Sequence, residues 1–171
     1  GQPADYMFKQ TFDGCSLLKS VPVNLFSGVS GTATGLFEGT FANTNLTGDI
    51  TGLFAGIKGI PADYMFSETF LNTNLKVIPD SLFDGVKGES EGDVGKYMFE
   101  NTFAGTGITA IPENLFSDMT PAEGMFYGTF SYTPITAIPQ YLFLHVSGSP
   151  KPYLFAYAFK NTKITSIPPI L

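Results

Sequence analysis

Apolar and polar positions repeat along the chain with a period close to 29 residues, and phenylalanine marks the repeat. All 17 phenylalanines fall into three sets. Successive members of the first set are separated by 29, 29, 33, 27 and 29 residues: Phe12, Phe41, Phe70, Phe103, Phe130 and Phe159. The second set lies four residues earlier, and the third is in Leu-Phe pairs: Phe26, Phe54, Phe83, Phe116 and Phe143. A fixed period of this length predicts a repeat architecture.

Each repeat predicts three short elements, which the fourth repeat displays in full. Phenylalanines four residues apart share one face of a helical turn, so we expect a short helical turn over 97–103. The β-branched stretch over 108–111 predicts a short strand. Pro112 ends that strand because proline cannot donate to a ladder. The Leu-Phe pair then forms a second turn.

A single repeat cannot bury three aromatic rings, so neighbouring repeats are expected to stack around one core. In-register stacking would place the strands side by side as a parallel sheet with right-handed crossovers. The sequence therefore predicts the α/β class, as a right-handed solenoid of about six coils. We expect a single domain over 1–171 with repeats starting near 6, 35, 64, 97, 124 and 153, the last of them truncated.

Composition removes several classes of function. The net charge is -6, and all nine basic residues are lysines, so the positive surface that binds nucleic acid or anionic lipid is missing. No apolar run reaches the ~18–20 residues that span a bilayer. Cys15 is the one cysteine, which excludes an internal disulfide and a cysteine-based zinc site.

The repeats resemble a known family. Residues 12–22 read Phe-Asp-Gly-Cys-Ser-Leu-Leu-Lys-Ser-Val-Pro, which resembles the Phe-x-x-Cys-x-x-Leu-x-x-Ile-Pro unit of BspA-type leucine-rich repeats in cell-surface proteins of Bacteroidetes-like bacteria. The resemblance covers the whole chain. It implies a leucine-rich-repeat solenoid, an extracellular location at the cell surface, a lipid anchor in the native full-length chain, and an adhesive role.

Two departures from that pattern carry expectations of their own. Five later repeats have threonine where the first has Cys15, at Thr44, Thr73, Thr106, Thr133 and Thr162. We expect this column to be buried and to satisfy backbone groups, with Cys15 as a structural thiol. In the second repeat, Asp49 occupies a position that is apolar elsewhere, which predicts a local bulge or a one-residue slip in contact with solvent.

The chain lacks the groups that catalysis requires. His145 is the one histidine, and no phosphate-binding loop, nucleophile elbow or zinc-protease motif is present. Asp5 and Asp63, in the recurring Pro-Ala-Asp-Tyr-Met-Phe, are expected to cap helical starts. We therefore predict that the protein is not an enzyme, with no catalytic, metal or cofactor-binding residues and no cofactor.

Candidate contact residues lie where the repeats depart from one another. Tyr127, Tyr132, Tyr141 and Tyr157 replace residues that are mostly polar or glycine elsewhere, and all lie in the last two coils. Tyrosine is enriched where proteins or sugars bind, although scattered surface tyrosines remain an alternative. The longest variable loop, 87–96, carries Glu89, Glu91 and Asp93 and is expected to be an acidic hairpin rather than a calcium loop. A further tyrosine set shares one register position and is interpreted as structural: Tyr6, Tyr64, Tyr97 and Tyr153.

The function predicted from these features is an extracellular protein–protein interaction or adhesion module of a bacterial surface protein. The alternatives are a carbohydrate-binding surface protein and a structural spacer domain. The expected partner is a host or bacterial surface protein or glycan, with no nucleic acid and no membrane span. Because Leu171 precedes the expected next phenylalanine, we also expect either a trimmed or proteolysed tail or an end-to-end dimer through the C-terminal coil. Asp80-Ser81-Leu82 resembles an O-glycosylation signal of Bacteroidetes, with Ser81 as acceptor.

Overall fold

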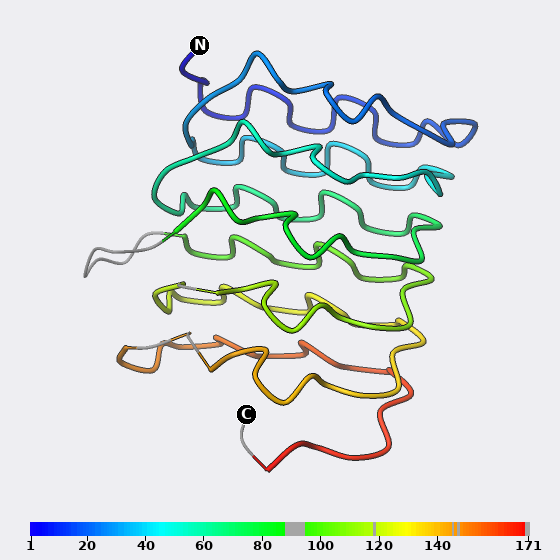
Figure 1. Cartoon of the computed structure of the whole chain (residues 1–171), viewed down its shortest axis with the longest axis vertical. Coiled ribbons are helices and arrows are strands. Elements are labelled where there is room, and N and C mark those ends of the chain that lie inside the picture. Colours follow the sequence, from blue (N-terminus) through cyan, green and yellow to red (C-terminus); the bar gives the residue numbers. More distant parts are fainter. Residues whose placement is uncertain (88–94, 118, 145, 147, 170–171) are drawn as a thin grey trace.

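The chain winds as a stack of similar coils with its two termini at opposite ends (Figure 1). This computed structural model describes residues 1–87, 95–117, 119–144, 146 and 148–169. Within those ranges there is no helix, and the β-pairing is one isolated parallel bridge between Gly59 and Val86. The prediction of an α/β leucine-rich-repeat solenoid with helical turns and a parallel sheet is therefore wrong.

Where helical turns were expected, each coil has a ten-residue run of overlapping β-turns, which we call the turn ribbon. The six turn ribbons span 5–14, 34–43, 63–72, 96–105, 123–132 and 152–161. In the first, the N–H groups of Met7, Lys9 and Thr11 each donate to the carbonyl three residues earlier. Every second residue thus closes a turn, instead of every residue donating to the carbonyl four back as in an α-helix.

Every fourth residue of a turn ribbon has a positive φ, which is the reason that no helix forms. These positions make three columns along the stack, and φ lies between 49° and 72° both at the glycines and at the other residues: Tyr6, Gly35, Tyr64, Tyr97, Gly124, Tyr153; Gln10, Gly39, Glu68, Asn101, Gly128, Tyr157; and Gly14, Asn43, Asn72, Gly105, Tyr132, Asn161. A positive φ at the third position of alternate turns is what type II turns require. Two successive turns advance the chain by four residues, so phenylalanines four apart face one side without a helix.

Hydrogen bonds between coils come from the residues that do not close turns. In the first turn ribbon, Tyr6, Phe8, Gln10, Phe12 and Gly14 donate their N–H groups to carbonyls of the second, over N···O distances of 2.7–3.0 Å. Each later junction between neighbouring turn ribbons repeats this set of five bonds, and in every case the earlier coil donates to the later one. The turn ribbons are therefore the hydrogen-bonded wall of the stack.

The segments expected to be strands are extended but unpaired for most of the stack. No backbone N–H of 74–78, 107–111 or 135–138 donates a hydrogen bond to another described residue. In the fifth coil Ile135 and Ile138 are buried, whereas Thr136 and Ala137 are exposed. Burial with period three matches a polyproline-II path with a solvated backbone, whereas a strand alternates with period two. The isoleucine spacing is thus the reason that the predicted sheet does not form.

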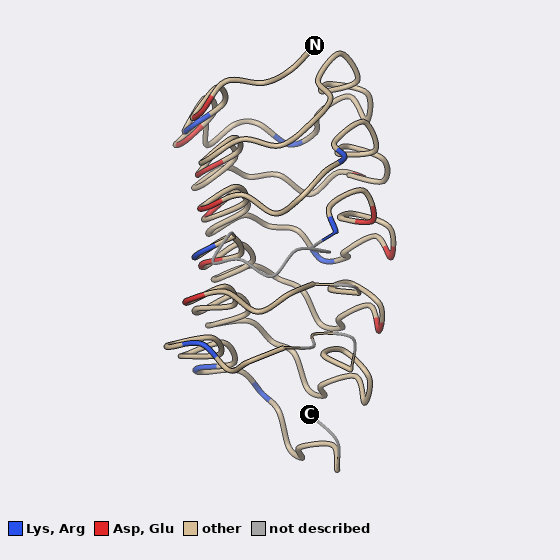
Figure 2. Ribbon diagram, turned by 90° about the vertical axis from the view of Figure 1, so that its left-hand side faces the viewer, with Lys and Arg blue, Asp and Glu red and all other residues tan. Residues whose placement is uncertain are grey.

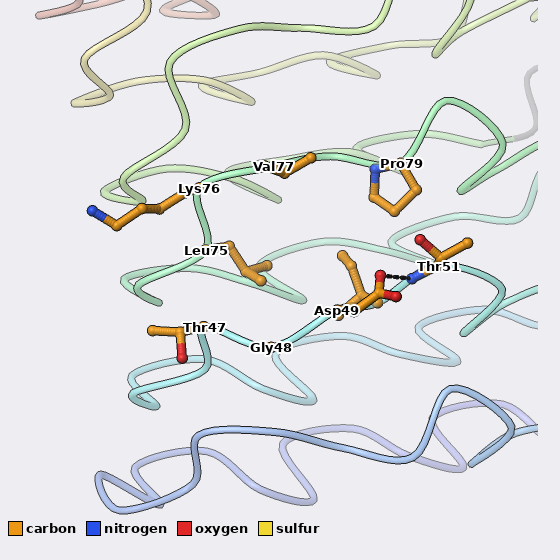
Figure 3. A pocket seen from close by; sticks show the side chains of 9 residues that line it. Thr47, Gly48, Asp49, Thr51, Leu75, Lys76, Val77 and Pro79 are labelled. Atoms are coloured by element: carbon orange, nitrogen blue, oxygen red, sulfur yellow. Dashed lines mark hydrogen bonds between the residues drawn. The ribbon is translucent and has the colours of Figure 1, made fainter.

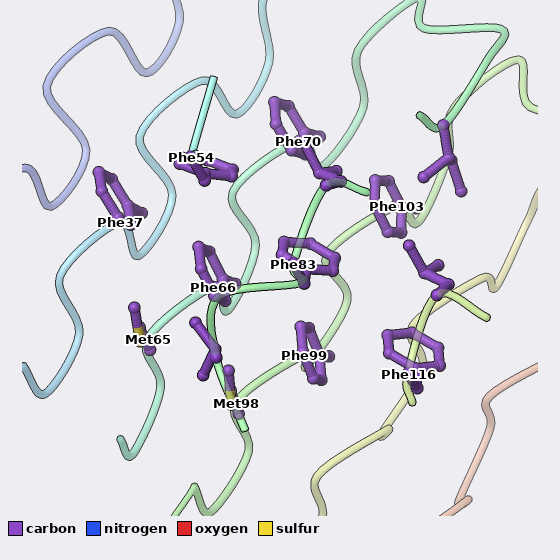
Figure 4. Close-up of a cluster of buried hydrophobic side chains, with 14 of the residues drawn as sticks. Phe37, Phe54, Met65, Phe66, Phe70, Phe83, Met98, Phe99, Phe103 and Phe116 are labelled. Carbon is purple, nitrogen blue, oxygen red and sulfur yellow. The ribbon is translucent and has the colours of Figure 1, made fainter. Parts of the chain in front are cut away.

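The core consists of three columns of phenylalanine rings (Figure 4). Rings of the first two sets stack nearly parallel on their counterparts in the next coil, as for Phe66 and Phe99 at 5.9 Å and Phe70 and Phe103 at 5.7 Å. Rings of the Leu-Phe set lie between these columns, and Phe83 contacts Phe66 and Phe99 at 4.6 and 4.9 Å. Such pairs contribute beyond the burial of their area, so the rings both fill the core and fix the register of the coils.

Two threonine columns satisfy core carbonyl groups. The Oγ1 of Thr102 donates to the Phe66 carbonyl of the preceding coil at 2.8 Å, and Thr40, Thr69 and Thr129 make the corresponding bond. The hydroxyl groups of the second column donate to carbonyls within their own turns: Thr44, Thr73, Thr106, Thr133 and Thr162. Buried backbone acceptors are thereby paired, as a packed core requires.

Three residues of the first coils differ from the expectations. Cys15 is exposed, so the prediction of a buried structural thiol is wrong; among the described residues the first coil packs against one neighbouring coil, whereas the coils of Thr44 and Thr73 lie between two. Asp5 and Asp63 do not cap helices. Asp63 Oδ1 accepts hydrogen bonds from the N–H groups of Gly95 and Lys96, and Asp5 Oδ1 accepts one from Thr34 N–H. Each carboxylate thus fixes the start of the following turn ribbon.

Candidate functional site

Tyrosines gather on the turn-ribbon wall because of its left-handed columns. A side chain on a positive-φ residue reaches toward the next coil, and glycine there leaves room for it. A Cβ added at Gly35 or Gly124 would lie 2.3 Å from the ring of Tyr6 or Tyr97, respectively. Non-glycine residues in this backbone conformation cost about 1–2 kcal/mol each, which the ring contacts must offset. The rings of Tyr6, Tyr64 and Tyr97 therefore lie against the next coil, over a glycine or another tyrosine.

Five tyrosines form one continuous row across the third to sixth coils. Tyr64 stacks on Tyr97 with ring centroids 5.6 Å apart. Tyr97 contacts Tyr127 at 6.1 Å, and Tyr127 meets Tyr157 edge-on at 5.1 Å. Lys160 Nζ lies 5.1 Å from the Tyr157 ring centroid and 5.8 Å from that of Tyr132. We call these five tyrosines together with Lys160 the tyrosine row.

The structure joins residues that the sequence had separated and separates others. Tyr127, Tyr132 and Tyr157 meet in the tyrosine row, but they do so with Tyr64 and Tyr97, which the sequence had marked as structural. Tyr141 lies in the Leu-Phe turn of the fifth coil and shares no ring contact or cation contact with the row in the described part of the chain. Glu89, Glu91 and Asp93 lie outside the described residues. Lys160 was not predicted from the sequence as part of the site, although it follows Tyr157 by only three residues.

The tyrosine row lies beside carboxylates. Figure 2 shows acidic residues of successive coils along one edge of the stack, with lysines at its last coil. Burial and then the charges of Glu100, Asp63, Glu123 and Glu38 raise the pKa of Tyr64. Desolvation and then Glu123 raise the pKa of Tyr97. Both phenols therefore stay protonated at neutral pH as potential hydrogen-bond donors in a negative field.

The carboxylates of neighbouring coils repel one another. The pKa of Glu68 is raised by burial and then by the charge of Glu38, and that of Glu100 by burial and then by Glu68. Two ion pairs offset part of this charge: Lys9 Nζ lies 3.0 Å from Glu38 Oε1, and Lys96 Nζ lies 3.9 Å from Glu123 Oε2. The face as a whole favours a cationic partner.

The arrangement of the rings limits what they can bind. The ring planes of Tyr64 and Tyr97 are almost parallel, 6° apart, and stacked, so each ring covers a face of the other. Among the described residues, no hydrogen bond uses a tyrosine hydroxyl. Tyr132 and Tyr157 are more than half exposed. The row therefore offers ring edges, hydroxyl groups and two open rings. These groups suit contact with the side chains of a protein, whereas sugar rings stack on broad aromatic faces.

No metal-binding cluster is present in the parts of the chain that the structure describes. No cluster of three histidine, cysteine or carboxylate side chains there could hold a metal ion. His145 lies outside the described residues. The described residues also contain no helix long and apolar enough to cross a bilayer. Ser81 is exposed in a Leu-Phe turn, so its position is open to modification, and the proposed glycosylation stays a prediction.

Asp49 lies beside a shallow groove between the extended segments of the second and third coils (Figure 3). Its Oδ1 accepts a hydrogen bond from Thr51 N–H at 2.8 Å, and hydrogen bonding by the Thr51 side chain, then by this N–H, lowers the pKa of its carboxyl. Leu46 and Ile50 are both buried and lie four residues apart, where the later coils have three, and Leu53 follows Ile50 by three residues, where the later coils have four. The irregularity is therefore a one-residue slip that leaves the length of the coil unchanged, and the carboxylate of the exposed Asp49 accepts a hydrogen bond from its own loop.

Comparison with known proteins adds no relative. No protein-family model matches the chain, and neither the search of curated proteins nor the search of solved structures found a match. The resemblance to BspA-type repeats therefore rests on the residues quoted above. What the protein binds has to be inferred from its own surface.

Proposed function

We propose that the chain is an extracellular interaction module that binds a basic protein surface through the tyrosine row. The observation that carries this proposal is the unbroken contact path from Tyr64 through Tyr97 and Tyr127 to Tyr157 on the edge where the carboxylates gather. Tyrosine offers large rigid contact area and a polar tip, the combination common at binding hot spots. The resemblance to surface-protein repeats agrees with an extracellular, adhesive role.

The charge of the site favours lysine or arginine on the partner. Glu100 and Glu123 flank Tyr64 and Tyr97 closely enough to raise the pKa of both phenols. A partner cation placed there would pair with the carboxylates and lie against tyrosine edges and rings. Complementary charge of this kind speeds association and weakens with salt. The carboxylates could also accept hydrogen bonds from sugar hydroxyl groups, but the stacking of Tyr64 and Tyr97 covers faces on which a sugar ring would stack.

The columns of the stack supply variants that preserve the fold. Y127S introduces the residue that Ser67 places at the same register position, and Y132N and Y157N introduce the asparagine found in their own columns at Asn72 and Asn101. Asparagine tolerates the left-handed conformation better than tyrosine does, so these changes should not unfold the coil. Y141N is the matched control, because Asn114 has the corresponding position in the fourth coil.

The test measures binding of the immobilised protein to a panel of purified extracellular proteins of high and low isoelectric point, together with a glycan array. We expect binding to basic proteins that weakens with salt, falls at least about tenfold in the triple variant Y127S/Y132N/Y157N, and is unchanged in Y141N. Equal binding by the triple variant would exclude the tyrosine row. Binding confined to glycans would favour the carbohydrate-binding alternative instead.

A further inference from the structure

The contact of Lys9 shows how the turn-ribbon wall holds an ammonium group. Lys9 follows Tyr6 by three residues, and its Nζ lies 5.1 Å from the Tyr6 ring centroid. The same Nζ lies 3.0 Å from Oε1 of Glu38, which belongs to the next coil. One cation thus contacts a tyrosine ring of its own coil and a carboxylate of the following coil. Both contacts favour the charged form of the lysine.

Lys160 repeats the first half of this arrangement. It also follows a tyrosine of positive φ by three residues, and its Nζ lies 5.1 Å from the ring centroid of Tyr157. Tyr157 and Tyr6 belong to different columns of the turn-ribbon wall. The turn-ribbon backbone therefore brings the side chain of the third residue after such a tyrosine close to the ring, whatever the column.

The third and fourth coils present a ring and a carboxylate in the same backbone frame, with serine in place of the lysine. Three residues there have the register positions of Tyr6, Lys9 and Glu38, in that order: Tyr64, Ser67 and Glu100. The φ of Tyr64 is 55°, and that of Tyr6 is 57°. The Glu68 N–H donates to the Glu100 carbonyl over 2.7 Å, and the Gln10 N–H donates to the Glu38 carbonyl over the same distance. The two frames therefore agree in backbone conformation and in the bond that joins the coils.

The groups of the second frame are open to a positive charge from outside. The Ser67 hydroxyl donates to Oε2 of Glu100 at 3.5 Å, and among the described residues Oε1 of Glu100 accepts no hydrogen bond. Tyr64 is 37% exposed and Glu100 is partly exposed, so solvent reaches both side chains. Burial and then the charge of Glu68 raise the pKa of Glu100, so a cation here would relieve repulsion between carboxylates.

We propose that Tyr64, Ser67 and Glu100 form a binding site for a primary ammonium group, the lysine side chain of the partner protein. We call these three residues the ammonium site. This inference deepens the proposed function and rests on it. The ammonium group would lie where the Nζ of Lys9 lies in the first coil, near the ring of Tyr64 and against the carboxylate of Glu100.

Lysine fits the ammonium site better than arginine. A guanidinium group gains most when it lies flat on an aromatic face and binds both oxygens of a carboxylate. Tyr97 stacks on Tyr64 at 5.6 Å and covers one face of its ring. Ser67 already binds one oxygen of Glu100. An ammonium group is a compact charge that needs only a ring edge and one carboxylate oxygen.

The column of Ser67 allows a lysine to be introduced into the site itself, because its other members include long side chains: Lys9, Glu38, Glu100 and Tyr127. S67K should place its own ammonium group against Glu100 and compete with the partner from within the molecule. S67Q has a neutral side chain of similar length, so the difference between the two variants isolates the charge. T109K adds the same charge on an extended segment, where Lys76 has the corresponding position in the preceding coil.

The first measurement is the titration of Glu100 by NMR in S67K and S67Q. The pKa of Glu100 should be lower in S67K, because a neighbouring ammonium group favours the charged carboxylate. Urea unfolding curves show whether each variant is folded. Equal pKa values in the two folded variants would mean that the geometry of Lys9 is not reproduced at Ser67, which would overturn the proposal.

The second measurement is the affinity for the synthetic peptides hexalysine and hexaarginine at physiological ionic strength. Hexalysine affinity should fall at least about fivefold in S67K relative to S67Q, and by a similar factor in E100Q relative to the unaltered chain. T109K should keep it within about twofold. Hexaarginine should lose less than hexalysine in S67K. Equal hexalysine affinities of S67K and S67Q would overturn the proposal, as would an E100Q variant that binds hexalysine like the unaltered chain.

The proposed function and the ammonium site can fail separately. Absence of binding to every basic protein of the panel would remove the proposed function, whereas the hexalysine affinities would still decide on the ammonium site. Binding of basic proteins that Y127S/Y132N/Y157N abolishes and S67K leaves intact would keep the tyrosine row and overturn the ammonium site.

Discussion

The turn ribbons and the extended segments are built from the same repeats and share one core, yet they are held in different ways. Five hydrogen bonds join each pair of neighbouring turn ribbons, whereas the extended segments over 74–78, 107–111 and 135–138 donate no backbone hydrogen bond to a described residue. Buried isoleucines anchor the extended segments from the inside only, as Ile108 and Ile111 do in the fourth coil. Regular stacking of coils therefore requires a hydrogen-bonded wall on one side, not on both.

Hydrogen exchange should give the largest contrast between the two sides. The amides of Phe99 and Phe103 donate to the next coil, whereas those of Thr109 and Ala110 have no partner among the described residues. We expect the first pair to exchange at least ~1,000-fold more slowly than the second, because their exchange requires opening of the stack. Exchange measured by NMR at single residues checks this. Comparable protection of both pairs would show that the extended segments are paired in solution.

Removing a ring from the hydrogen-bonded side should cost the most stability. Phe99 is fully buried between Phe66 and Phe126, with centroids 5.9 and 5.8 Å away. F99A should lower the free energy of unfolding by about 3–5 kcal/mol through lost burial and the cavity left behind. The control is V77A, which truncates a side chain that is 72% exposed. V77A should change the free energy of unfolding by less than about 0.5 kcal/mol. Urea unfolding compares the two, and a small loss for F99A would mean that the ring columns collapse around the gap.

Two threonines of the fourth coil test the difference with a single hydroxyl group. Thr102 donates to the Phe66 carbonyl from a buried position, whereas Thr109 is exposed on the extended segment. T102V should cost about 0.5–1.5 kcal/mol, because the shape is kept and only the hydrogen bond is lost. T109V should stay within about 0.5 kcal/mol. Equal effects in the same urea experiment would remove the structural distinction between the two threonines.

The smallest effect concerns the carboxylates of the turn ribbons. Because the pKa of Glu100 in the folded state lies above its ordinary value of 4.5, the folded state binds more protons than the unfolded state in the window between the two pKa values. This site therefore loses stability as pH rises through that window. E100Q should be more stable than the unaltered chain at pH 7 by less than about 1 kcal/mol, and the advantage should fade near pH 4. E113Q, in an exposed Leu-Phe turn, is the control; an advantage of E100Q that does not depend on pH would contradict this linkage.

The phenylalanine period could be taken from the sequence, and the rings that it places in register are those that stack, such as Phe37 on Phe66. The local backbone conformation could not be predicted from the sequence, because a spacing of four residues occurs both in a helix and in paired β-turns. The informative signal was the occurrence of glycine, asparagine or tyrosine at every fourth residue, as at Tyr97, Asn101 and Gly105. The property that these different residues share is a positive φ. The strand prediction was wrong for a related reason: Ile135 and Ile138 are three apart, so they cannot share one face of a strand.

Part of the candidate site was also open to prediction. Tyr127, Tyr132 and Tyr157 stand out from their columns in sequence. Their contact with Tyr97 and Lys160 depends on which way a left-handed residue directs its side chain, and this direction follows only from the backbone. Tyr141 shares their sequence signature but lies on a different turn, so the signature alone could not separate it from the row.

The uniform direction of the bonds between turn ribbons gives the molecule an electrical polarity. Since every inter-coil N–H points from the earlier coil to the later one, the corresponding peptide groups align along the stack axis, as they do in a helix but with the opposite relation to chain direction. The last coil is therefore the positive pole and the first coil the negative one. Lys151 and Lys160 lie at the positive pole and Asp5 and Asp13 at the negative pole, so each end of an isolated molecule is electrostatically unfavourable.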